Sequence, residues 1–260
     1  MRLHWTLRDG SVVIIAGRTA VKRYRGKGAR VLLARQRIGY ESAVKCTVWR
    51  SLVVPMQFGP FSLAFSPAGS AIPDDDGGTL VAFVDDLVSR ALHAGRWSAL
   101  EHLIPLNELA AVLEEAGATA LFKNVESSIQ RIVLPVGPTH GDLHRGNLVL
   151  LRSGTRVIDF DRFRPAGCPL FDLLHFHLSE VQRGTGLRWL EVLRERSDLT
   201  VQAANGMVPL EELNLSYGLQ RIAHEGYAAR LQGRELAKYV LQTKRVLEAF
   251  LQPEMRVETA

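Results

Sequence analysis

The residues most suited to chemistry lie near the middle of the chain, where positions 140–147 read HGDLHRGN and positions 158–161 read IDFD. Three carboxylates (Asp142, Asp159 and Asp161), an asparagine amide and two histidines fall within this short stretch. Short apolar runs flank both segments, which places the polar groups at strand ends. Carboxylate and amide oxygens are the ligands that a hard cation such as Mg²⁺ prefers. A lone Asp in a loop is usually a turn former, but that role does not explain the whole set.

The type, order and spacing of these residues resemble the kinase-like phosphotransferases, the superfamily of aminoglycoside phosphotransferases and choline kinases. The shared pattern is H-x-D-x-x-x-x-N followed by an I-D-F strand end, close to the H-R-D-x-x-x-x-N and D-F-G pair of protein kinases. The similarity extends to Asp172 in the run PLFDLL. It implies an α+β, bilobal protein-kinase-like fold, with a small β-rich N-terminal lobe and a larger, mainly helical C-terminal lobe.

The resemblance also implies a role for each residue of the motif. Asp142 would be the catalytic residue, which accepts a hydrogen bond from the acceptor hydroxyl as base or orienter. Asn147 and Asp159 would hold Mg²⁺ against the phosphates of ATP or GTP. His140 would fix the loop by hydrogen bonds, and Asp172 would brace it. Phosphoryl transfer depends mainly on positioning and charge neutralisation, so few protein groups suffice.

The same resemblance implies that the N-terminal lobe contains a lysine on a strand and a glutamate on a helix. Lys22, in the run AVK, is similar to the V-A-I-K lysine of kinases and is expected to contact nucleotide phosphates. Glu41 is the only glutamate before Glu101, and an ion pair with Lys22 would orient the lysine. The lobe departs from the kinase pattern in one respect, since no G-x-G-x-x-G lies between its first two expected strands.

The hydrophobic pattern predicts elements that fit this division. We expect an N-terminal lobe over 1–66, a linker over 67–79 and a helical lobe over 80–260. In the first lobe the pattern predicts three strands joined by a turn at Asp9-Gly10 and by a second turn at Gly17-Arg18. A helical pattern follows over 29–52, interrupted near Gly39, and two short strands follow within 53–65. The second lobe shows helical spacing over 80–92, 107–116, 118–131, 172–182, 186–195, 210–232 and 235–251.

Composition excludes several classes of protein. The 260 residues are 47% hydrophobic and 23% charged, which excludes a disordered chain or a collagen-like one. No apolar run approaches the roughly 18 residues that a membrane span needs. The two cysteines, Cys46 and Cys168, lie far apart in no CxxC spacing, so neither a zinc site nor a disulfide framework is expected. A reducing cytoplasm is the predicted location.

Charge is distributed unevenly along the chain. Residues 1–60 hold twelve Lys and Arg against two acidic residues, a balance of +10, whereas residues 80–260 have a balance of −2. A basic N-terminal quarter implies an anionic partner, such as nucleotide phosphates, nucleic acid or an anionic membrane surface, or else a solvated basic face. Nucleic acid is not expected, because no recognition motif with interleaved aromatic residues is present. Peripheral membrane contact through this lobe stays open.

Several functions are compatible with these residues. The leading one is an ATP- or GTP-dependent kinase of a small hydroxylated molecule. A non-catalytic nucleotide-binding module with the same fold is a second, and a metal-dependent hydrolase built on His140, Asp142 and His144 is a third. The run IDFDR looks like that of sugar kinases of the bacterial lipopolysaccharide core, so a sugar or glycan is the leading acceptor, ahead of an amino alcohol. A polycationic aminoglycoside is not favoured by the weak negative balance of the second lobe.

The acceptor is expected to be a small molecule or glycan because of a distance along the chain. Only twelve residues separate Asp159 from Asp172, and no A-P-E occurs among them. The segment is therefore too short for the platform on which protein kinases lay a substrate peptide. The acceptor pocket should then come from the helices within 172–250.

Five other residues have further interpretations. His175 and His177 lie on an apolar helix and are expected to be packed or half-exposed there. Asp161 could be a second metal ligand or a turn cap. Arg162 and Arg164 could face either substrate or solvent.

Overall fold

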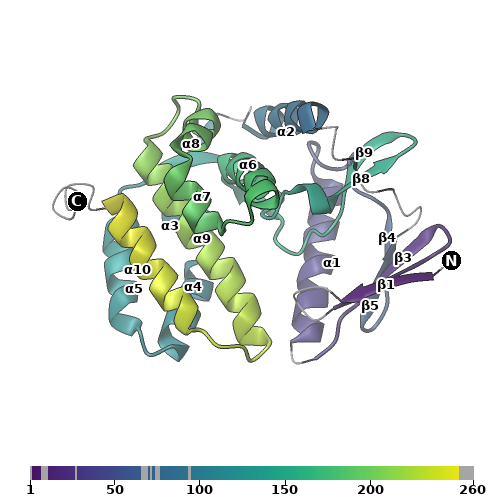
Figure 1. The fold of residues 1–260 in the computed structure, drawn as a ribbon, viewed down its shortest axis with the longest axis horizontal. Helices are drawn as coiled ribbons and strands as arrows, with labels where there is room; N and C mark the ends of the chain where they lie inside the picture. The colour runs from purple at the N-terminus through teal and green to yellow at the C-terminus, as the bar shows by residue number, and fades with distance from the viewer. Residues whose placement is uncertain are drawn as a thin grey trace.

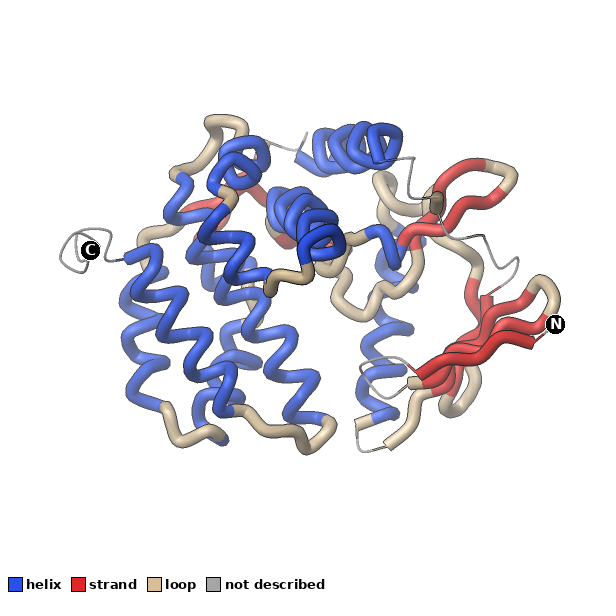
Figure 2. Tube along the Cα trace, in the orientation of Figure 1, coloured by secondary structure: helices blue, strands red, loops and turns tan. Residues whose placement is uncertain are grey.

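The computed structural model describes residues 2–6, 11–26, 28–65, 70, 72–73, 77–92 and 95–251. An antiparallel sheet lies at one end of the molecule and a group of long helices at the other, with one helix of the N-terminal segment between them (Figure 1). Figure 2 shows the N-terminal strands gathered at one end and the long helices at the other, with shorter strands between them. This is the α+β, kinase-like division into a β-rich and a helical part that the sequence predicts.

The N-terminal sheet contains five strands in the order β1-β2-β3-β5-β4. They are β1 (Arg2–Thr6), β2 (Val12–Ala16), β3 (Thr19–Arg23), β4 (Met56–Phe58) and β5 (Ser62–Phe65). All neighbouring pairs are antiparallel, and Lys22 in β3 lies opposite Leu63 in β5. The predicted three-stranded meander and the two strands within 53–65 are therefore confirmed, while the predicted turn at Asp9-Gly10 lies outside the described residues.

Helix α1 (Ala29–Lys45) covers this sheet with an apolar face that includes Leu32 and Leu33. The predicted interruption near Gly39 is wrong, because α1 runs unbroken through that position. Gly39 is instead a point of close approach: a Cβ there would overlap the carbonyl oxygen of Phe160. The glycine lets the helix lie directly against the chain that follows Asp159.

We expect Gly39→Ala to destabilise the protein by about 1–3 kcal/mol, because the added methyl must push α1 away from the Phe160 carbonyl. The matched control is Gly184→Ala in helix α6 (Pro169–Thr185), where a Cβ meets no atom within 4 Å. That control should be neutral or slightly stabilising, since alanine favours helix more than glycine does. Urea unfolding of both variants measures the difference, and equal midpoints would contradict the predicted close contact.

The helical part is organised around α9 (Leu210–Leu231), which is buried along most of its length. It packs against α4 (Leu106–Glu115) and α10 (Ala237–Leu251), and the three lie side by side in Figure 1. The remaining helices are α2 (Gly77–Leu92), α3 (Leu100–Leu103), α5 (Thr119–Ile129), α6, α7 (Trp189–Glu195) and α8 (Ser197–Ala204). The long helices predicted from hydrophobic spacing are all present, with small differences at their ends.

Two small sheets sit between these parts and carry the polar loop. One has the order β10-β7-β6, from β6 (Arg96–Ala99), β7 (Val133–Thr139) and β10 (Arg164–Gly167), and the other pairs β8 (Leu148–Leu151) with β9 (Gly154–Val157). Strand β7 ends directly before His140, and β9 ends two residues before Asp159. Because β10 pairs with β7, the segment after Asp159 is held in a sheet and does not form an extended platform.

Most of the predicted linker over 67–79 lies outside the described residues, although α2 begins at Gly77 within it. Its one described strand contact is an isolated antiparallel bridge between Ser70 and Leu150. A second, parallel bridge joins Val53 to Val157 and so ties the chain after α1 to the β8–β9 hairpin. Within the part of the chain that the structure describes, no helix is long and apolar enough to cross a membrane.

Candidate active site

Asp172 anchors the polar loop to the helical part. Its carboxylate, near the start of α6, accepts hydrogen bonds from the backbone N–H groups of His140 (2.6 Å) and Gly141 (2.8 Å). Burial raises the pKa of Asp172 to about 7, against the opposing effect of the two N–H donors. The position of Asp172 is the one that the resemblance implies for a residue that braces the loop.

We expect Asp172→Ala to lower the free energy of unfolding by about 2–5 kcal/mol, because it leaves two buried backbone N–H groups without an acceptor. The control is Asp198→Ala, which removes an exposed carboxylate paired with Arg196 and should have little effect. Chemical denaturation compares the two variants. Equal stabilities would show that other groups hold the loop.

His140 links the loop to the strand end that precedes Asp159. Its Nε2 lies 2.9 Å from the carbonyl oxygen of Ile158. Because a carbonyl oxygen only accepts hydrogen bonds, Nε2 carries the hydrogen and donates to it. The ring is fully buried against Trp49 and Phe160, and burial lowers its pKa. A neutral, buried imidazole suits a structural residue, which is the role that the resemblance implies.

Asp159 has a left-handed backbone conformation, with φ of 66°. Such a conformation is uncommon for a residue other than glycine, and at functional sites it marks a side chain whose direction is fixed by its surroundings. The carboxylate forms an ion pair with Lys22, whose Nζ lies 2.9 and 3.1 Å from the two oxygens. Strand β3 and the end of the IDF motif therefore meet although 137 positions separate them.

Lys22 and Glu41, both within the described part of the chain, do not form the expected ion pair in the structure. Lys22 pairs with Asp159, while Glu41 has an exposed side chain on α1. The buried face of α1 contains Leu32, Gln36 and Gly39, and Glu41 follows Gly39 by two positions. Two residues correspond to roughly 200° around an α-helix, so Glu41 points away from the buried side on which Gly39 meets Phe160.

Asp142 is surrounded by cationic and hydrogen-bonding groups from three segments. Its Oδ1 lies 2.7 Å from Nη1 of Arg221, 3.1 Å from Nε2 of His175 and 3.3 Å from Nη1 of Arg162. Burial would raise the pKa of Asp142, but Arg162, His175 and Arg221 outweigh it and hold the pKa well below its usual value. Asp142 is therefore a fixed carboxylate whose Oδ1 is fully engaged, which leaves Oδ2 for another donor.

His175 is neutral and connects Asp142 to the interior. Burial and the charge of Arg221 lower the pKa of His175 to about 3. Its Nδ1 lies 2.8 Å from the hydroxyl of Tyr217. Because a carboxylate only accepts hydrogen bonds, Nε2 carries the proton and donates to Asp142, and the Tyr217 hydroxyl donates to Nδ1.

The sequence predicts that His175 is packed or half-exposed, without a role at the site, and it does not single out Arg221. Arg221 lies 79 positions beyond Asp142 in α9 and is itself buried. The available signal was a set of ionisable residues, Arg221, His224 and Glu225, close together within the predicted helix over 210–232. Arg162, which sequence left open between substrate and solvent, contacts Asp142.

The residues expected to hold a metal provide a suitable set of oxygens. Nδ2 of Asn147 donates to the backbone carbonyl of Asp142 (2.9 Å), so its side-chain oxygen is directed elsewhere. Asp161 lies close enough to Asp159 that burial and the neighbouring charge raise its pKa to about 6. Two adjacent carboxylates and an amide oxygen fit Mg²⁺, which would relieve the repulsion between the carboxylates.

The described residues do not support a metal site made of histidine and aspartate. Among them, no group of three or more His, Cys, Asp or Glu side chains is placed to hold a metal ion. Nε2 of His144 lies 3.9 Å from Oδ2 of Asp142, and burial lowers the pKa of His144. His140 is bound to the Ile158 carbonyl, so the three residues do not converge on one point.

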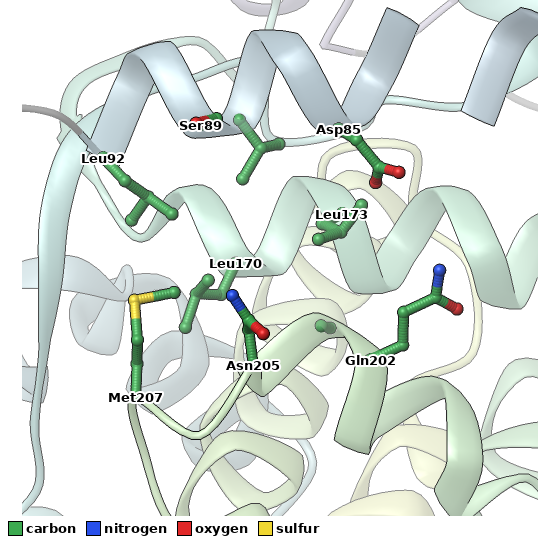
Figure 3. A pocket seen from close by; sticks show the side chains of 10 residues that line it. Asp85, Ser89, Leu92, Leu170, Leu173, Gln202, Asn205 and Met207 are labelled. Carbon is green, nitrogen blue, oxygen red and sulfur yellow. The ribbon is translucent and has the colours of Figure 1, made fainter. Parts of the chain in front are cut away.

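A separate cavity of about 490 Å³ lies between α2, α6 and α8. Figure 3 shows Asp85 and Ser89 of α2 on one side, Leu170 and Leu173 of α6 in the middle, and Gln202 of α8 on the other. None of the residues expected to act in phosphoryl transfer lines this cavity. The candidate active site, around Asp142 and Asp159, is therefore a different part of the molecule from this cavity.

Comparison with solved structures shows the fold to be shared with several kinases. A choline kinase from Streptococcus pneumoniae has 16% identity and a TM-score of 0.56, with 93% of this chain and 89% of that chain covered. An aminoglycoside-3′-phosphotransferase of type VIII has 16% identity and a TM-score of 0.56 over 86% and 93% of the two chains. An ethanolamine kinase from Plasmodium vivax has 9% identity and a TM-score of 0.55 over 96% and 83%.

The sequence comparisons are more selective. No curated protein gives a significant match. A family model described as the phosphotransferase enzyme family matches residues 65–210, which is more than half of the chain and contains the loop, Asp159 and Asp172. The chain therefore belongs to the phosphotransferase enzyme family and is a kinase-like phosphotransferase.

Proposed function

We propose that the protein is an Mg²⁺-dependent kinase that transfers the γ-phosphate of ATP, or of GTP, to a hydroxyl group of a small molecule or glycan. The observation that carries the proposal is the pairing of Lys22 with Asp159 beside a loop whose Asp142 is fixed by Arg221 and His175. A phosphate-binding lysine, a metal carboxylate and a carboxylate for the acceptor are the groups that phosphoryl transfer requires.

Asp142 would orient the acceptor hydroxyl through its remaining oxygen, Oδ2. The hydroxyl oxygen attacks the γ-phosphorus, the bond from phosphorus to the β–γ bridging oxygen breaks, and the nucleoside diphosphate leaves. Because the pKa of Asp142 is held well below its usual value, the carboxylate is a weak base. It therefore acts mainly by positioning the hydroxyl and accepts the proton only as the new bond forms.

Lys22 and the metal-binding residues would serve the nucleotide. On nucleotide binding, Lys22 would donate to phosphate oxygens, and Asp159 would be released from the ion pair. Asn147, Asp159 and Asp161 are the residues that would hold Mg²⁺, which neutralises phosphate charge when bound. Asp161 thus becomes a metal ligand in this proposal, in preference to a turn cap.

A sugar or glycan hydroxyl is the proposed acceptor, with an amino alcohol as the second candidate because choline and ethanolamine kinases share the fold. The short segment between Asp159 and Asp172 supports a compact acceptor, since part of it pairs with β7. The two other functions have less support. A hydrolase site needs a convergent His and Asp cluster, and a non-catalytic module does not need Asp142 fixed by three donors.

The test is a transfer assay with γ-labelled ATP, Mg²⁺ and a small-molecule extract, followed by separation of labelled products. We expect a labelled small molecule or glycan that depends on Mg²⁺ and disappears with Asp142→Asn. Replacing ATP by GTP identifies the nucleotide. Thermal stabilisation by nucleotide without any labelled product would favour the non-catalytic module, and Zn²⁺-dependent turnover without nucleotide would favour the hydrolase.

A further inference from the structure

We propose that the acceptor carries an anionic group, a carboxylate or a phosphate, close to the hydroxyl that is phosphorylated, and that Arg162 binds this group. The inference rests on the proposed kinase function and specifies its substrate class. It comes from Arg162, whose guanidinium lies beside Asp142, and from the surrounding residues of α9.

Three other arginines of this part of the molecule have close partners. Arg35 of α1 pairs with Glu108 at 3.0 Å, and Arg221 pairs with Glu225 at 2.7 Å as well as with Asp142. Arg164 donates to the carbonyl oxygens of His102 and Leu103. Although Nε of Arg221 is buried without a partner among the described residues, the close contacts of these three arginines assign them structural roles.

Arg162 differs from them. Within the described part of the chain, its guanidinium forms a single hydrogen bond, of 3.3 Å to Oδ1 of Asp142. That oxygen already accepts from Arg221 and His175 at shorter distances, so Asp142 does not need Arg162 in order to stay fixed. The guanidinium has five donors in a planar fork that matches the oxygens of a carboxylate or phosphate. It can therefore turn to an acceptor anion while Asp142 keeps its other partners.

His224 provides an independent indication of the same region. It lies on α9 one turn beyond Arg221, is only 5% exposed, and its Nδ1 is buried without a hydrogen-bond partner. Burial, followed by the charges of Arg162, Arg221 and Arg35, holds the pKa of His224 well below its usual value. The imidazole is therefore neutral, and its Nδ1 is a buried polar atom that no described protein group satisfies.

The carboxylates of this region pair with its arginines. Glu108 of α4 and Glu225 of α9 are each paired with an arginine, Asp142 is shared between Arg221 and Arg162, and Asp161 precedes Arg162 in the chain. The preference for an anion therefore comes from the Arg162 guanidinium itself, which lies beside the carboxylate that would bind the acceptor hydroxyl. A quaternary amine or a polyamine would meet this guanidinium at close range and be repelled by it, whereas an anion would accept hydrogen bonds from its remaining donors.

The experiment identifies the charge of the acceptor directly. The full-length protein is incubated with γ-labelled ATP, Mg²⁺ and a small-molecule extract, and each labelled product is isolated and its acceptor part identified. We expect the preferred acceptor to be a carboxylate or a phosphate ester, and mass measurement separates these two. A neutral or cationic preferred acceptor would overturn the inference but leave the kinase proposal standing. No labelled product at all would overturn the kinase proposal, and this inference with it.

Arg162→Gln then tests the residue. Removing the charged hydrogen bonds between the Arg162 guanidinium and the anionic group should lower kcat/KM for the anionic acceptor by roughly tenfold to a hundredfold. Most of this loss should appear as a higher KM. For a neutral analogue of the same acceptor the loss should be much smaller, and Arg162→Lys should restore part of the preference. Arg164→Gln is the matched control and should leave the ratio between the two acceptors unchanged. Equal losses for both acceptors in Arg162→Gln would show that Arg162 only positions Asp142.

Discussion

Asp142→Asn is expected to lower the turnover number by roughly a hundredfold or more, because it removes the carboxylate that positions the acceptor hydroxyl and takes its proton as the new bond forms. The amide keeps the size of the side chain and can still accept at the oxygen that faces Arg221 and His175. It presents an NH₂ donor where the acceptor hydroxyl needs an acceptor, so the hydroxyl is no longer oriented toward the γ-phosphate. The measurement is phosphate transfer at saturating acceptor and Mg·ATP.

The same variant should keep its fold and its affinity for nucleotide. Arg221 loses a negative partner, but Glu225 remains paired with it at 2.7 Å, so the buried guanidinium is not left without a counter-charge. Thermal unfolding and nucleotide titration provide the controls. Full activity would remove Asp142 from the mechanism, and a loss of activity accompanied by unfolding would assign it a structural role.

The arrangement of the polar loop over 140–147 could be predicted from sequence because its geometry is local. Residues 140–147 and 158–161 are joined by the short β8–β9 hairpin, so their spacing along the chain determines which groups meet. Asp172 follows soon after and opens α6, and the distance from it to the loop is small enough for one carboxylate to reach two adjacent backbone N–H groups. Order and spacing were sufficient for all these residues.

The partners of Asp142 and Lys22 could not be predicted in the same way. Arg221 reaches Asp142 from α9 only because α9 is buried at the centre of the helical part, and that packing is a property of the whole chain. Glu41 is the only glutamate in its region, which made it the predicted partner of Lys22. Composition, however, does not determine which way a side chain points. The spacing of Leu32, Gln36 and Gly39 does determine it, since residues three and four apart share one helix face.

Two short strands, β6 and β10, could not be predicted from the sequence, for a physical reason. The strands β6 and β10 contain four residues each, and the run RPAG of β10 has neither alternation nor β-branched residues. Pairing with the longer β7 stabilises it, so its structure depends on a neighbour and not on its own pattern.

Asp159→Ala is expected to abolish Mg²⁺-dependent nucleotide binding, because it removes the strand-end carboxylate that would face the phosphates. Calorimetric titration with Mg·ATP measures the loss. The structure adds a complication, since Asp159 has a φ of 66°. Alanine is strained in that conformation by about 1–2 kcal/mol, so the Ala variant changes the backbone energy as well as the chemistry.

Asp159→Gly separates the two effects. Glycine adopts positive φ without strain, so this variant should keep the local backbone while it lacks the carboxylate. Both variants also leave Lys22 without Asp159, and any cost of that loss is common to them. We therefore expect equal losses of Mg²⁺-dependent binding in the two variants, with a lower unfolding temperature for Ala than for Gly. Unchanged Mg·ATP affinity in Asp159→Gly would show that Asp159 is a structural turn residue, and binding lost only in Asp159→Ala would attribute the effect to the backbone.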